Sequence, residues 1–545
     1  MFRFCFQATV QFARRTFSLT SIAAVGLLIS ASANGTPASQ AADIEVFLSG
    51  SSAQDESLES LMRMRSDLPG IPSVCETDTL DVYRGRIDGV RKRVFLCTTS
   101  GHMPGVPGGL ILAVHKSSGG SGEGVTPITD QLAVPYFDLE ALRRKEACAQ
   151  SSPVLKSGDL SAYQNHRSCN AGSVTRIPIA GISDIEPDLL AENPEHLVTT
   201  SLAQIVWGLP VSKNLRNALQ AIQGLVPAEV PHDDPARDTE ARMPTLSRTQ
   251  VASIFAGTLD SWNEVLDLEG RSIAVSSVLA ESPPARPDLS GTAPGAYRPD
   301  SASGRPIYIC RRIDSSGTQA AYEVHYLRQR CTTDAPQFVL PDDGSSVVEG
   351  GDVSRLVRTP TPAGRVFAGV GTSDVRACLD AHDDYNRWAI GMFSTENTGN
   401  NASREYRYIR VDGSSPTLIN AQQGRWTHVS QPSMQWHETI ASDVDKSHEG
   451  NVMRFISDNI ARPEVLRTLN TSFRHPWGRG GYLAVPRGAH DFSSGAVAGE
   501  DLDQRPMAGT TRTLDGITRN CNVGLIGGAT SAAFREDPQA ASAIP

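Results

Sequence analysis

Apolar and polar residues alternate at 44–48, where the sequence is Ile-Glu-Val-Phe-Leu, and this period of two predicts a β-strand. After a turn at 49–52, the apolar residues recur at the spacing of one helix face, so a helix is expected next. A similar order of strand, Ser/Gly/Thr-rich turn and helix occurs at 177–184 and at 307–327. Alternating strands and helices predict an α/β protein.

One further helix has a clear start signal. Ser247 and Gln250 form the pattern of a capping box, and the apolar residues that follow share one helix face up to Gly257. The stretch 281–306 is rich in Pro, Ser, Gly and Ala, which predicts a surface excursion rather than a core element.

Length and composition narrow the class of protein. The chain has 545 residues, 39% hydrophobic and 20% charged, which is typical of a soluble globular protein and allows two to four domains. With 47 Gly and 34 Pro, much of the chain is expected to be loop. The net charge of −10 argues against a general nucleic-acid binder, which needs a basic face.

The N-terminus has the pattern of a secretory signal. Residues 1–41 carry no Asp, Glu or Lys but three arginines, which precede an apolar run at 22–33 and small residues. We expect a signal peptide over 1–41, with cleavage after Ala33 or Ala41. The mature chain would then carry a charge of −13 and would be periplasmic or secreted.

The cysteines fit an exported chain. One of the nine lies in the signal, and an even number in a secreted protein indicates disulfides. Three neighbouring pairs have nearly equal spacing, which suggests local bridges. The expected pairs are Cys75–Cys97, Cys148–Cys169, Cys310–Cys331 and Cys378–Cys521.

Motifs of catalysis and metal binding are missing. The Gly-rich stretch 117–124 lacks the Lys-Ser/Thr of a phosphate-binding P-loop. The stretch 443–449 begins like a calcium loop, but His448 stands where Gly is needed and Arg454 where Glu is needed. The sequence also has no GxSxG elbow, HExxH pair or zinc-type CxxC. We therefore expect no metal and no cofactor.

The three Ser/Gly/Thr-rich turns are candidate anion sites. The first turn of a helix has unpaired N–H groups and a partial positive charge, and Ser and Thr hydroxyls add donors there. An arginine, such as Arg312 before the third turn, adds a planar fork that matches an oxyanion. A serine at a helix start is most often a simple N-cap, so a site requires that the turns converge.

Four stretches resemble the periplasmic phosphate-binding proteins of the PstS/DING type. Residues 246–263 resemble the family's LTRxQVAxIFxGxxxxWN stretch, and 312–318 resemble its RxDGSGT anion loop. Residues 179–184 resemble the GASD turn, and 388–392 the xxIGY segment. The matches occur in the family's order between about 43 and 490.

The resemblance implies a two-lobe α/β protein of the type II periplasmic-binding-protein fold, with the ligand in an interlobe cleft. Lobe 1 would comprise 42–205 and 405–545, and lobe 2 would comprise 206–404. The chain is longer than a transport binding protein, with insertions expected around 75–170 and 265–305.

The resemblance also implies the ligand-binding residues. Asp184 would accept the proton of a hydrogenphosphate and repel sulfate, and Arg312 would clamp the anion while Asp314 holds Arg312. Hydroxyl and backbone donors would complete the set: Ser51, Ser52, Ser183, Ser316, Gly317 and Thr318.

These expectations favour a monomeric, non-enzymatic, exported protein that captures a small oxyanion, with inorganic phosphate as the favoured ligand and an ABC transporter permease as a candidate partner. A secreted phosphatase-like enzyme on the same scaffold is one alternative; turnover of a chromogenic phosphate ester would favour it. An interaction or adhesion protein that lost its ligand is another; a site that does not respond to anions would support it.

Overall fold

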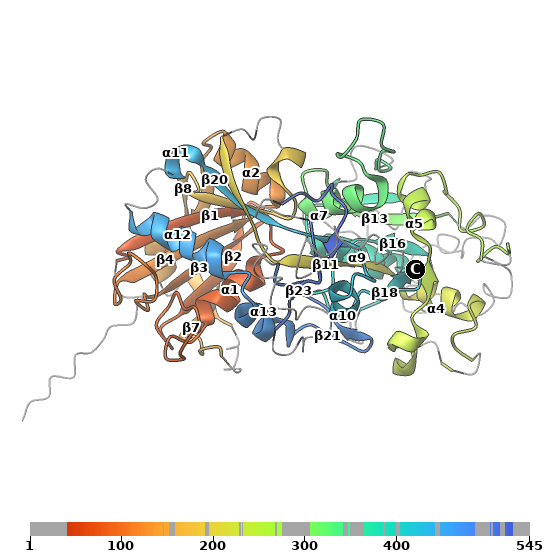
Figure 1. The fold of residues 1–545 in the computed structure, drawn as a ribbon, viewed down its shortest axis with the longest axis horizontal. Coiled ribbons are helices and arrows are strands. Elements are labelled where there is room, and N and C mark those ends of the chain that lie inside the picture. Colours follow the sequence, from red (N-terminus) through yellow and green to blue (C-terminus); the bar gives the residue numbers. More distant parts are fainter. Residues whose placement is uncertain are drawn as a thin grey trace, which may run out of the picture.

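The structure is a computed structural model that describes residues 41–526 apart from several internal gaps, the longest of which are 275–305, 349–364 and 486–501. The expected signal over 1–41, apart from its last residue, and nearly all of the expected excursion at 281–306 therefore lie outside the described residues. Two large sheets form two lobes that lie side by side (Figure 1). This is the two-lobe α/β architecture that the sequence predicts.

The first lobe is built on a 9-stranded sheet with the order β10-β20-β9-β1-β4-β3-β2-β7-β6. At its centre β1 pairs in parallel with β9 on one side and β4 on the other, so the carboxyl ends of these three strands lie at one edge. The strands of this sheet are β1 (Ile44–Gly50), β2 (Asp81–Ile87), β3 (Val90–Thr98), β4 (Ile111–Ser118), β6 (Cys148–Gln150), β7 (Asn165–Cys169), β9 (Ala180–Ser183), β10 (Leu197–Ser201) and β20 (Ser433–His437).

The second lobe is built on a 10-stranded sheet around β11, a strand that is buried along its whole length. In this sheet β13 pairs in parallel with β15 and β16. The strands are β11 (Gln204–Ser212), β12 (Thr245–Leu246), β13 (Tyr308–Arg312), β14 (Val347–Val348), β15 (Val366–Gly369), β16 (Ala389–Gly391), β17 (Phe393–Ser394), β18 (Tyr406–Val411), β19 (Val429–Ser430) and β23 (Tyr482–Leu483).

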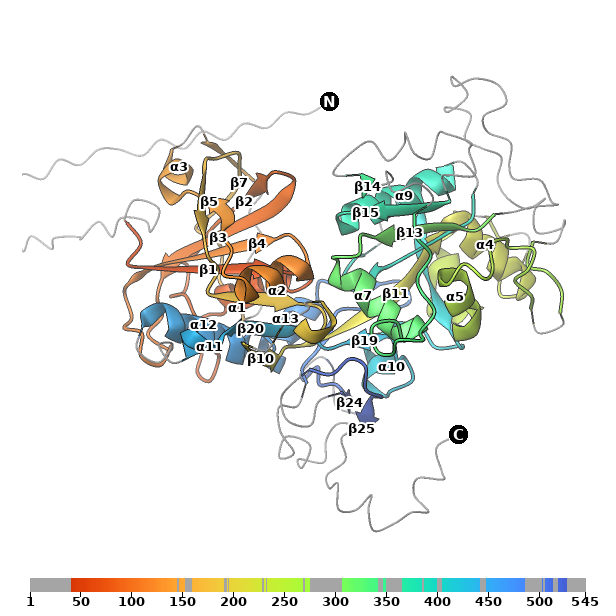
Figure 2. The same ribbon diagram turned by 90° about the horizontal axis from the view of Figure 1, so that it is seen from above.

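Helices cover both sheets (Figure 2), and three two-stranded ribbons complete the described strands. The ribbons pair β5 (Val134–Phe137) with β8 (Ser173–Arg176), β21 (Arg474–His475) with β22 (Gly478–Arg479), and β24 (Thr510–Thr511) with β25 (Leu525–Ile526). The α-helices are α1 (Asp55–Arg63), α2 (Ser121–Thr129), α3 (Leu139–Arg143), α4 (Lys213–Ile222), α5 (Arg248–Phe255), α7 (Gly317–Tyr322), α9 (Thr372–Asp384), α10 (Leu418–Gln422), α11 (Glu438–Ala441), α12 (His448–Asn459) and α13 (Pro463–Asn470). Short 3-10 turns are η3 (Pro187–Leu189), η4 (Pro235–Asp238) and η5 (Glu240–Arg242), and η7 (Glu323–Leu327) is a π-helix that continues α7. None of the helices within the described part is both long and apolar enough to cross a membrane.

Two of the three expected strand–turn–helix units are present, and the third is wrong in detail. At 177–184 the strand is β9, which occupies Ala180–Ser183 where a turn was expected, and only the 3-10 turn η3 follows it. The strand expected at 44–48 is β1, and the expected helix after it is α1. The capping box is confirmed, because the Ser247 hydroxyl accepts from the Gln250 amide while the Gln250 side chain accepts from the Ser247 amide.

The chain passes between the two sheets three times within the described part. The first passage joins β10 to β11 at Leu202 and Ala203, and the second joins β19 to β20 at Gln431 and Pro432. The third leads from α13, which packs on α1 of the first lobe, to β23 in the second sheet. The predicted end of lobe 2 at residue 404 falls before β18, which pairs with β11 in the second sheet. We therefore propose that the second-lobe segment extends to the passage at 431–432.

Two of the four expected disulfides are confirmed and two are wrong. Cys75–Cys97 and Cys148–Cys169 join neighbouring chain segments of the first lobe. Instead of the other two expected pairs, the structure has Cys310–Cys378 and Cys331–Cys521. Cys310 lies on β13, and the helix pair α7–η7 carries the chain away from it before Cys331, whereas α9 packs across β13 and brings Cys378 to it.

The Cys331–Cys521 bridge fixes a C-terminal segment across the first two passages between the lobes. Thr518 lies 2.8 Å from the Ser201 hydroxyl and donates to the Pro432 carbonyl over 3.3 Å. Asn520 exchanges hydrogen bonds with the backbone of Gln431. The segment 518–521 is therefore a strap over the interlobe connections, and the disulfide fixes its end to the second lobe.

We predict that removing this bridge destabilises the protein more than removing a local one. The Cys331–Cys521 bridge closes 190 residues and Cys75–Cys97 closes 22, so loop entropy favours the longer bridge by roughly 2 kcal/mol. Urea unfolding of C331S/C521S and C75S/C97S should show the larger loss for the first double variant. Equal losses of stability in the two double variants would contradict the role of the strap.

Candidate anion-binding site

The site begins at the shared carboxyl edge of β9, β1 and β4. Ligands of open α/β sheets bind at such edges, where loops diverge. The Ser51 amide donates to the Ile182 carbonyl over 2.7 Å, and the Gly120 amide donates to the Gly50 carbonyl over 3.3 Å, so the three strand ends are joined by backbone hydrogen bonds.

Glycines allow helix α2 to begin directly against these strand ends. A Cβ on Gly124 would lie 2.1 Å from the Ile182 carbonyl oxygen, and a Cβ on Gly181 would lie 1.8 Å from the Gly124 carbonyl oxygen. No side chain fits at either position. The Gly-rich stretch 117–124 thus serves close packing of α2 on β9 and β1, although it is not a P-loop.

Asp184 is the centre of the first-lobe half of the site. Its side chain accepts a hydrogen bond from the Ser51 hydroxyl, and its backbone amide donates to the Ser121 hydroxyl over 2.9 Å. The residue is only 2% exposed, and burial raises the pKa of its carboxyl to about 6 from 3.8, while the Ser51 hydrogen bond and the charges of Arg312 and Lys116 oppose this rise. Burial thus brings its protonation close to neutral pH.

The second lobe reaches this carboxyl through the loop after β13. The Gly122 amide donates to the Ser315 carbonyl over 3.2 Å, which joins the two lobes. A Cβ on Gly317 would lie 1.9 Å from the Ser121 hydroxyl and 2.8 Å from the Asp184 Cβ. Gly317 therefore packs against the first-lobe site in a way that no residue with a side chain could.

Arg312 ends β13 and is buried next to this contact. Its guanidinium donates to the Gly369 and Val370 carbonyls over 3.2 and 2.5 Å, and to the Thr372 hydroxyl over 3.4 Å. Burial lowers the pKa of Arg312 to about 10, and the charges of Asp184 and Asp374 act against that shift. The group remains a cation at neutral pH, and it interacts electrostatically with Asp184.

The expected pairing of Asp314 with Arg312 is wrong. The Asp314 carboxylate accepts instead from the guanidinium of Arg311, and its side chain is 69% exposed. Neighbouring residues of a strand point to opposite faces, so Arg311 and Arg312 cannot both face the same carboxylate. Arg312 is held from the β15–α9 connection instead.

The remaining expected residues lie at the same junctions. At the start of α1, the Ser52 carbonyl accepts a hydrogen bond from the Asp55 amide. The Ser183 hydroxyl accepts a hydrogen bond from the Ile185 amide over 3.4 Å. Ser316 is the N-cap residue of α7, and its own amide donates to the Ile313 carbonyl. Thr318 is buried in the first turn of that helix.

Sequence reasoning missed two groups at this site, Lys116 and Ser121. Lys116 lies near the end of β4 and is fully buried; it donates to the Ser117 carbonyl over 2.7 Å and lies 3.9 Å from the Asp55 carboxylate. Burial lowers the pKa of its ammonium to about 8. A lysine within the apolar strand at 111–118 and a serine at a strand–turn–helix junction are signals for both, but their place at the site depends on the pairing of β4 with β1, which no local motif shows.

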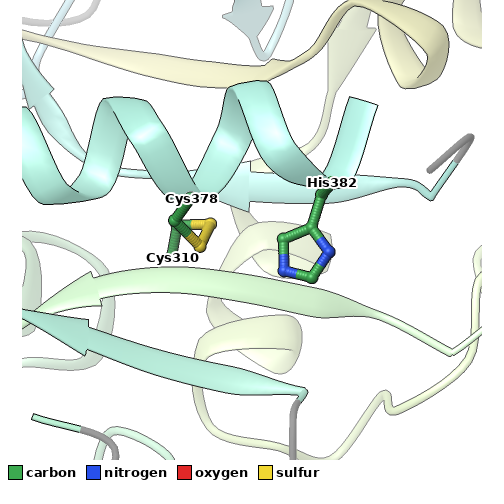
Figure 3. A group of neighbouring side chains, drawn as sticks. All are labelled: Cys310, Cys378 and His382. Atoms are coloured by element: carbon green, nitrogen blue, oxygen red, sulfur yellow. A yellow bond between two sulfur atoms is a disulfide. The ribbon is translucent and has the colours of Figure 1, made fainter. Parts of the chain in front are cut away.

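One group of residues has the proximity, but not the chemistry, of a metal site. Cys310, Cys378 and His382 lie together (Figure 3), but the two sulfur atoms form a disulfide and are not thiolates. The His382 ring lies 4.5 Å from the ring of Tyr308, and burial lowers its pKa to about 3. These residues form a packed core rather than a ligand set.

Of the comparisons with known proteins, the one with solved structures finds similar proteins. No family model and no curated protein matches the chain. A substrate-binding protein of Clostridium perfringens with bound phosphate is 11% identical, covering 78% of this chain and 97% of that one, with a TM-score of 0.35. An ABC-type phosphate transport receptor from Vibrio cholerae is 12% identical over 79% and 98%, with a TM-score of 0.33. PstS from Borrelia burgdorferi is 10% identical over 76% and 92%, with a TM-score of 0.29.

The first two are named for phosphate binding or transport, and the third is named as PstS. The two-lobe α/β fold itself rests on the two sheets and their connections in this structure.

We predict that Asp184→Asn stabilises the protein at neutral pH. Because the folded-state pKa is raised to about 6 from 3.8, the stability that the protonated carboxyl contributes is present below pH 4 and is lost as the pH rises through 6. The asparagine does not ionise, so the variant should exceed wild type by about 1–3 kcal/mol at pH 8 and match it more closely at pH 4. Urea unfolding at both pH values measures this.

The exposed Asp130 provides the control, since Asp130→Asn should change the stability little at either pH. A pH-independent difference between Asp184→Asn and wild type would show that the Asp184 carboxyl does not titrate as described.

Proposed function

We propose that this chain is an exported solute-binding protein that captures a small oxyanion between its lobes, with inorganic phosphate as the favoured ligand. One observation carries the proposal. Ser51, Asp184 and Arg312 come from three separate strand ends in two sheets, yet they form one buried polar group at the contact between the lobes.

The chemistry of this group suits a protonated tetrahedral anion. Arg312 contributes a positive charge and a planar fork, and the hydroxyls of Ser51 and Ser121 are further polar partners. A carboxyl beside an anion is tolerated only where it faces a donor, and the hydroxyl of a hydrogenphosphate is such a donor. Asp184 would therefore accept that proton, and would disfavour sulfate, which has none to give.

The overall charge of the protein works against anion capture. The mature chain would carry −13, so its affinity must come from local donors rather than from the field of the whole protein. Arg312 and Lys116 supply that local charge beside Asp184.

Binding would require the lobes to part and close again. The Gly122–Ser315 hydrogen bond and the packing of Gly317 on Ser121 join the lobes across the site, so an entering oxyanion must separate them. It would also compete with the Ser51 hydroxyl for the Asp184 carboxyl. Rotation about the three passages between the lobes would provide the hinge, as in other two-lobe binding proteins. Export and delivery to a membrane transporter belong to the same proposal.

Calorimetry with phosphate on refolded and dialysed protein tests the function. Wild type should bind phosphate with a micromolar-range Kd, and Arg312→Ala should weaken binding at least tenfold, because a charge-assisted hydrogen bond contributes about 1.5–3 kcal/mol. Arg312→Lys, which retains the charge, should lie between them.

Arg65→Ala is the matched control, since that arginine pairs with Asp67 at the exposed surface away from the site. Wild-type protein that binds no phosphate, or equal affinities for Arg65→Ala and Arg312→Ala, would contradict the proposal.

A further inference from the structure

The loop that carries Ser51 is also contacted from outside the anion site. The Ala53 amide donates to the Ser51 hydroxyl over 3.0 Å, and the Ala53 carbonyl accepts from the Tyr482 hydroxyl over 2.5 Å. Tyr482 lies on β23, which pairs with β11 beside the passage between the lobes. A residue more than 400 positions away thus holds the first ligand loop.

Tyr482 is itself held firmly. Its amide donates to the Asn470 side chain over 3.0 Å, and its carbonyl accepts from the same side chain over 2.8 Å. The side chain is completely buried. The position of the hydroxyl is therefore fixed by α13 and β23, independently of the loop that it contacts.

The same hydroxyl contacts a carboxyl group of the second lobe, that of Glu396. Glu396 follows β17, and the neighbouring Thr395 binds the Val206 carbonyl on β11 through both its amide and its hydroxyl. Ala53, Tyr482 and Glu396 therefore form a chain of contacts from the first ligand loop to the second sheet.

The number of available protons determines how Ala53, Tyr482 and Glu396 are hydrogen-bonded to one another. The Ala53 carbonyl can only accept, and the Tyr482 hydroxyl has one proton to give. Two hydrogen bonds between three oxygen atoms need two protons, so the second must come from Glu396 in its protonated form. When Glu396 is ionised, Tyr482 must choose between a carboxylate and the Ala53 carbonyl, and a hydrogen bond to the charged group is the stronger.

The surroundings of Glu396 favour its protonated form. Burial raises the pKa of this carboxyl to about 8, and the negative charges of Glu56 and Asp55 on α1 act in the same direction. Arg91 and a hydrogen bond from Ser394 act against the rise, and the buried Tyr408 interacts electrostatically with Glu396.

We propose that Tyr482 and Glu396 are positioning residues for the anion site, with protonated Glu396 directing the Tyr482 hydroxyl to the Ala53 carbonyl and thereby fixing the loop of Ser51. Only the expected effect on phosphate affinity rests on the proposed function. When Glu396 ionises, the O–H bond of Tyr482 turns from the Ala53 carbonyl to the Glu396 carboxylate. The ligand loop then loses one of its hydrogen bonds.

The first test needs no ligand. Hydrogen exchange of the peptide at 51–58 is compared between wild type and Glu396→Gln at pH 6 and pH 9, so that intrinsic exchange rates cancel at each pH. The glutamine amide keeps a donor toward Tyr482 at both pH values. We expect equal protection at pH 6 and about fivefold faster exchange in wild type at pH 9, as for the loss of one ordinary hydrogen bond.

The second test is phosphate calorimetry on the same proteins at the same pH values. The ratio of the wild-type Kd to that of Glu396→Gln should rise about fivefold between pH 6 and pH 9, because the titration of phosphate itself cancels in the ratio. Compared with Glu396→Gln, which keeps the contact to Ala53, Tyr482→Phe should exchange faster at 51–58 and bind more weakly at both pH values.

Tyr408→Phe is the matched control. Its hydroxyl binds the Ser394 and Asn397 carbonyls, each over 2.9 Å, so its loss loosens the segment around Glu396 without removing a contact to Ala53. Exchange at 51–58 should stay at the wild-type rate in this variant.

The outcomes separate this inference from the proposed function. Equal exchange in wild type and Glu396→Gln at both pH values, or equal acceleration in Tyr408→Phe and Tyr482→Phe, would overturn the positioning role even if phosphate binds. A pH-dependent difference in exchange in a protein that binds no phosphate would support the positioning role and overturn the proposed ligand.

Discussion

The burial of one carboxyl group, that of Asp184, between two lobes is the constraint on which the site depends. An ionised carboxylate in such a place is costly unless donors surround it, and burial is the main cause of its raised pKa. Its partners are drawn from separate junctions: Ser51 after β1, Ser121 at the start of α2, and the glycine at 317 across the lobe contact. The positions of Ser51 and Ser121 depend on the parallel pairing of β9, β1 and β4, which brings their carboxyl ends together.

The connections between the lobes are constrained in a second way. β11 carries partners from several parts of the chain, and the strap at 518–521 lies across the passages at 202–203 and 431–432 under the Cys331–Cys521 bridge. The strap therefore restrains two of the three passages between the lobes. The disulfides therefore do more than stabilise insertions, since one of them joins the second lobe to the interlobe connections.

Much of this architecture could be predicted from the sequence, because it depends on local patterns. Alternation at 44–48, the capping box at Ser247 and the Ser/Gly/Thr-rich turns before α1 and α7 are each decided within a few residues, and the structure contains the corresponding elements. The motif resemblance also placed Asp184 and Arg312 at strand ends that the structure brings together. Contacts between distant segments could not be predicted in this way. The partner of Cys310 depends on how α9 crosses β13, and the partner of Asp314 depends on which face of β13 each arginine occupies. Lys116 is a cation of the site only because β4 lies beside β1 in the sheet.

The central claim is that the buried group around Asp184 and Arg312 holds a tetrahedral oxyanion. A crystal structure of the refolded protein grown with phosphate tests it most directly. The account predicts a phosphate within hydrogen-bond distance of both the Asp184 carboxyl and the Arg312 guanidinium, with the Ser51 hydroxyl turned from Asp184 to the anion. A structure in which Ser51 still binds Asp184 and phosphate lies elsewhere, or is not bound, would contradict it.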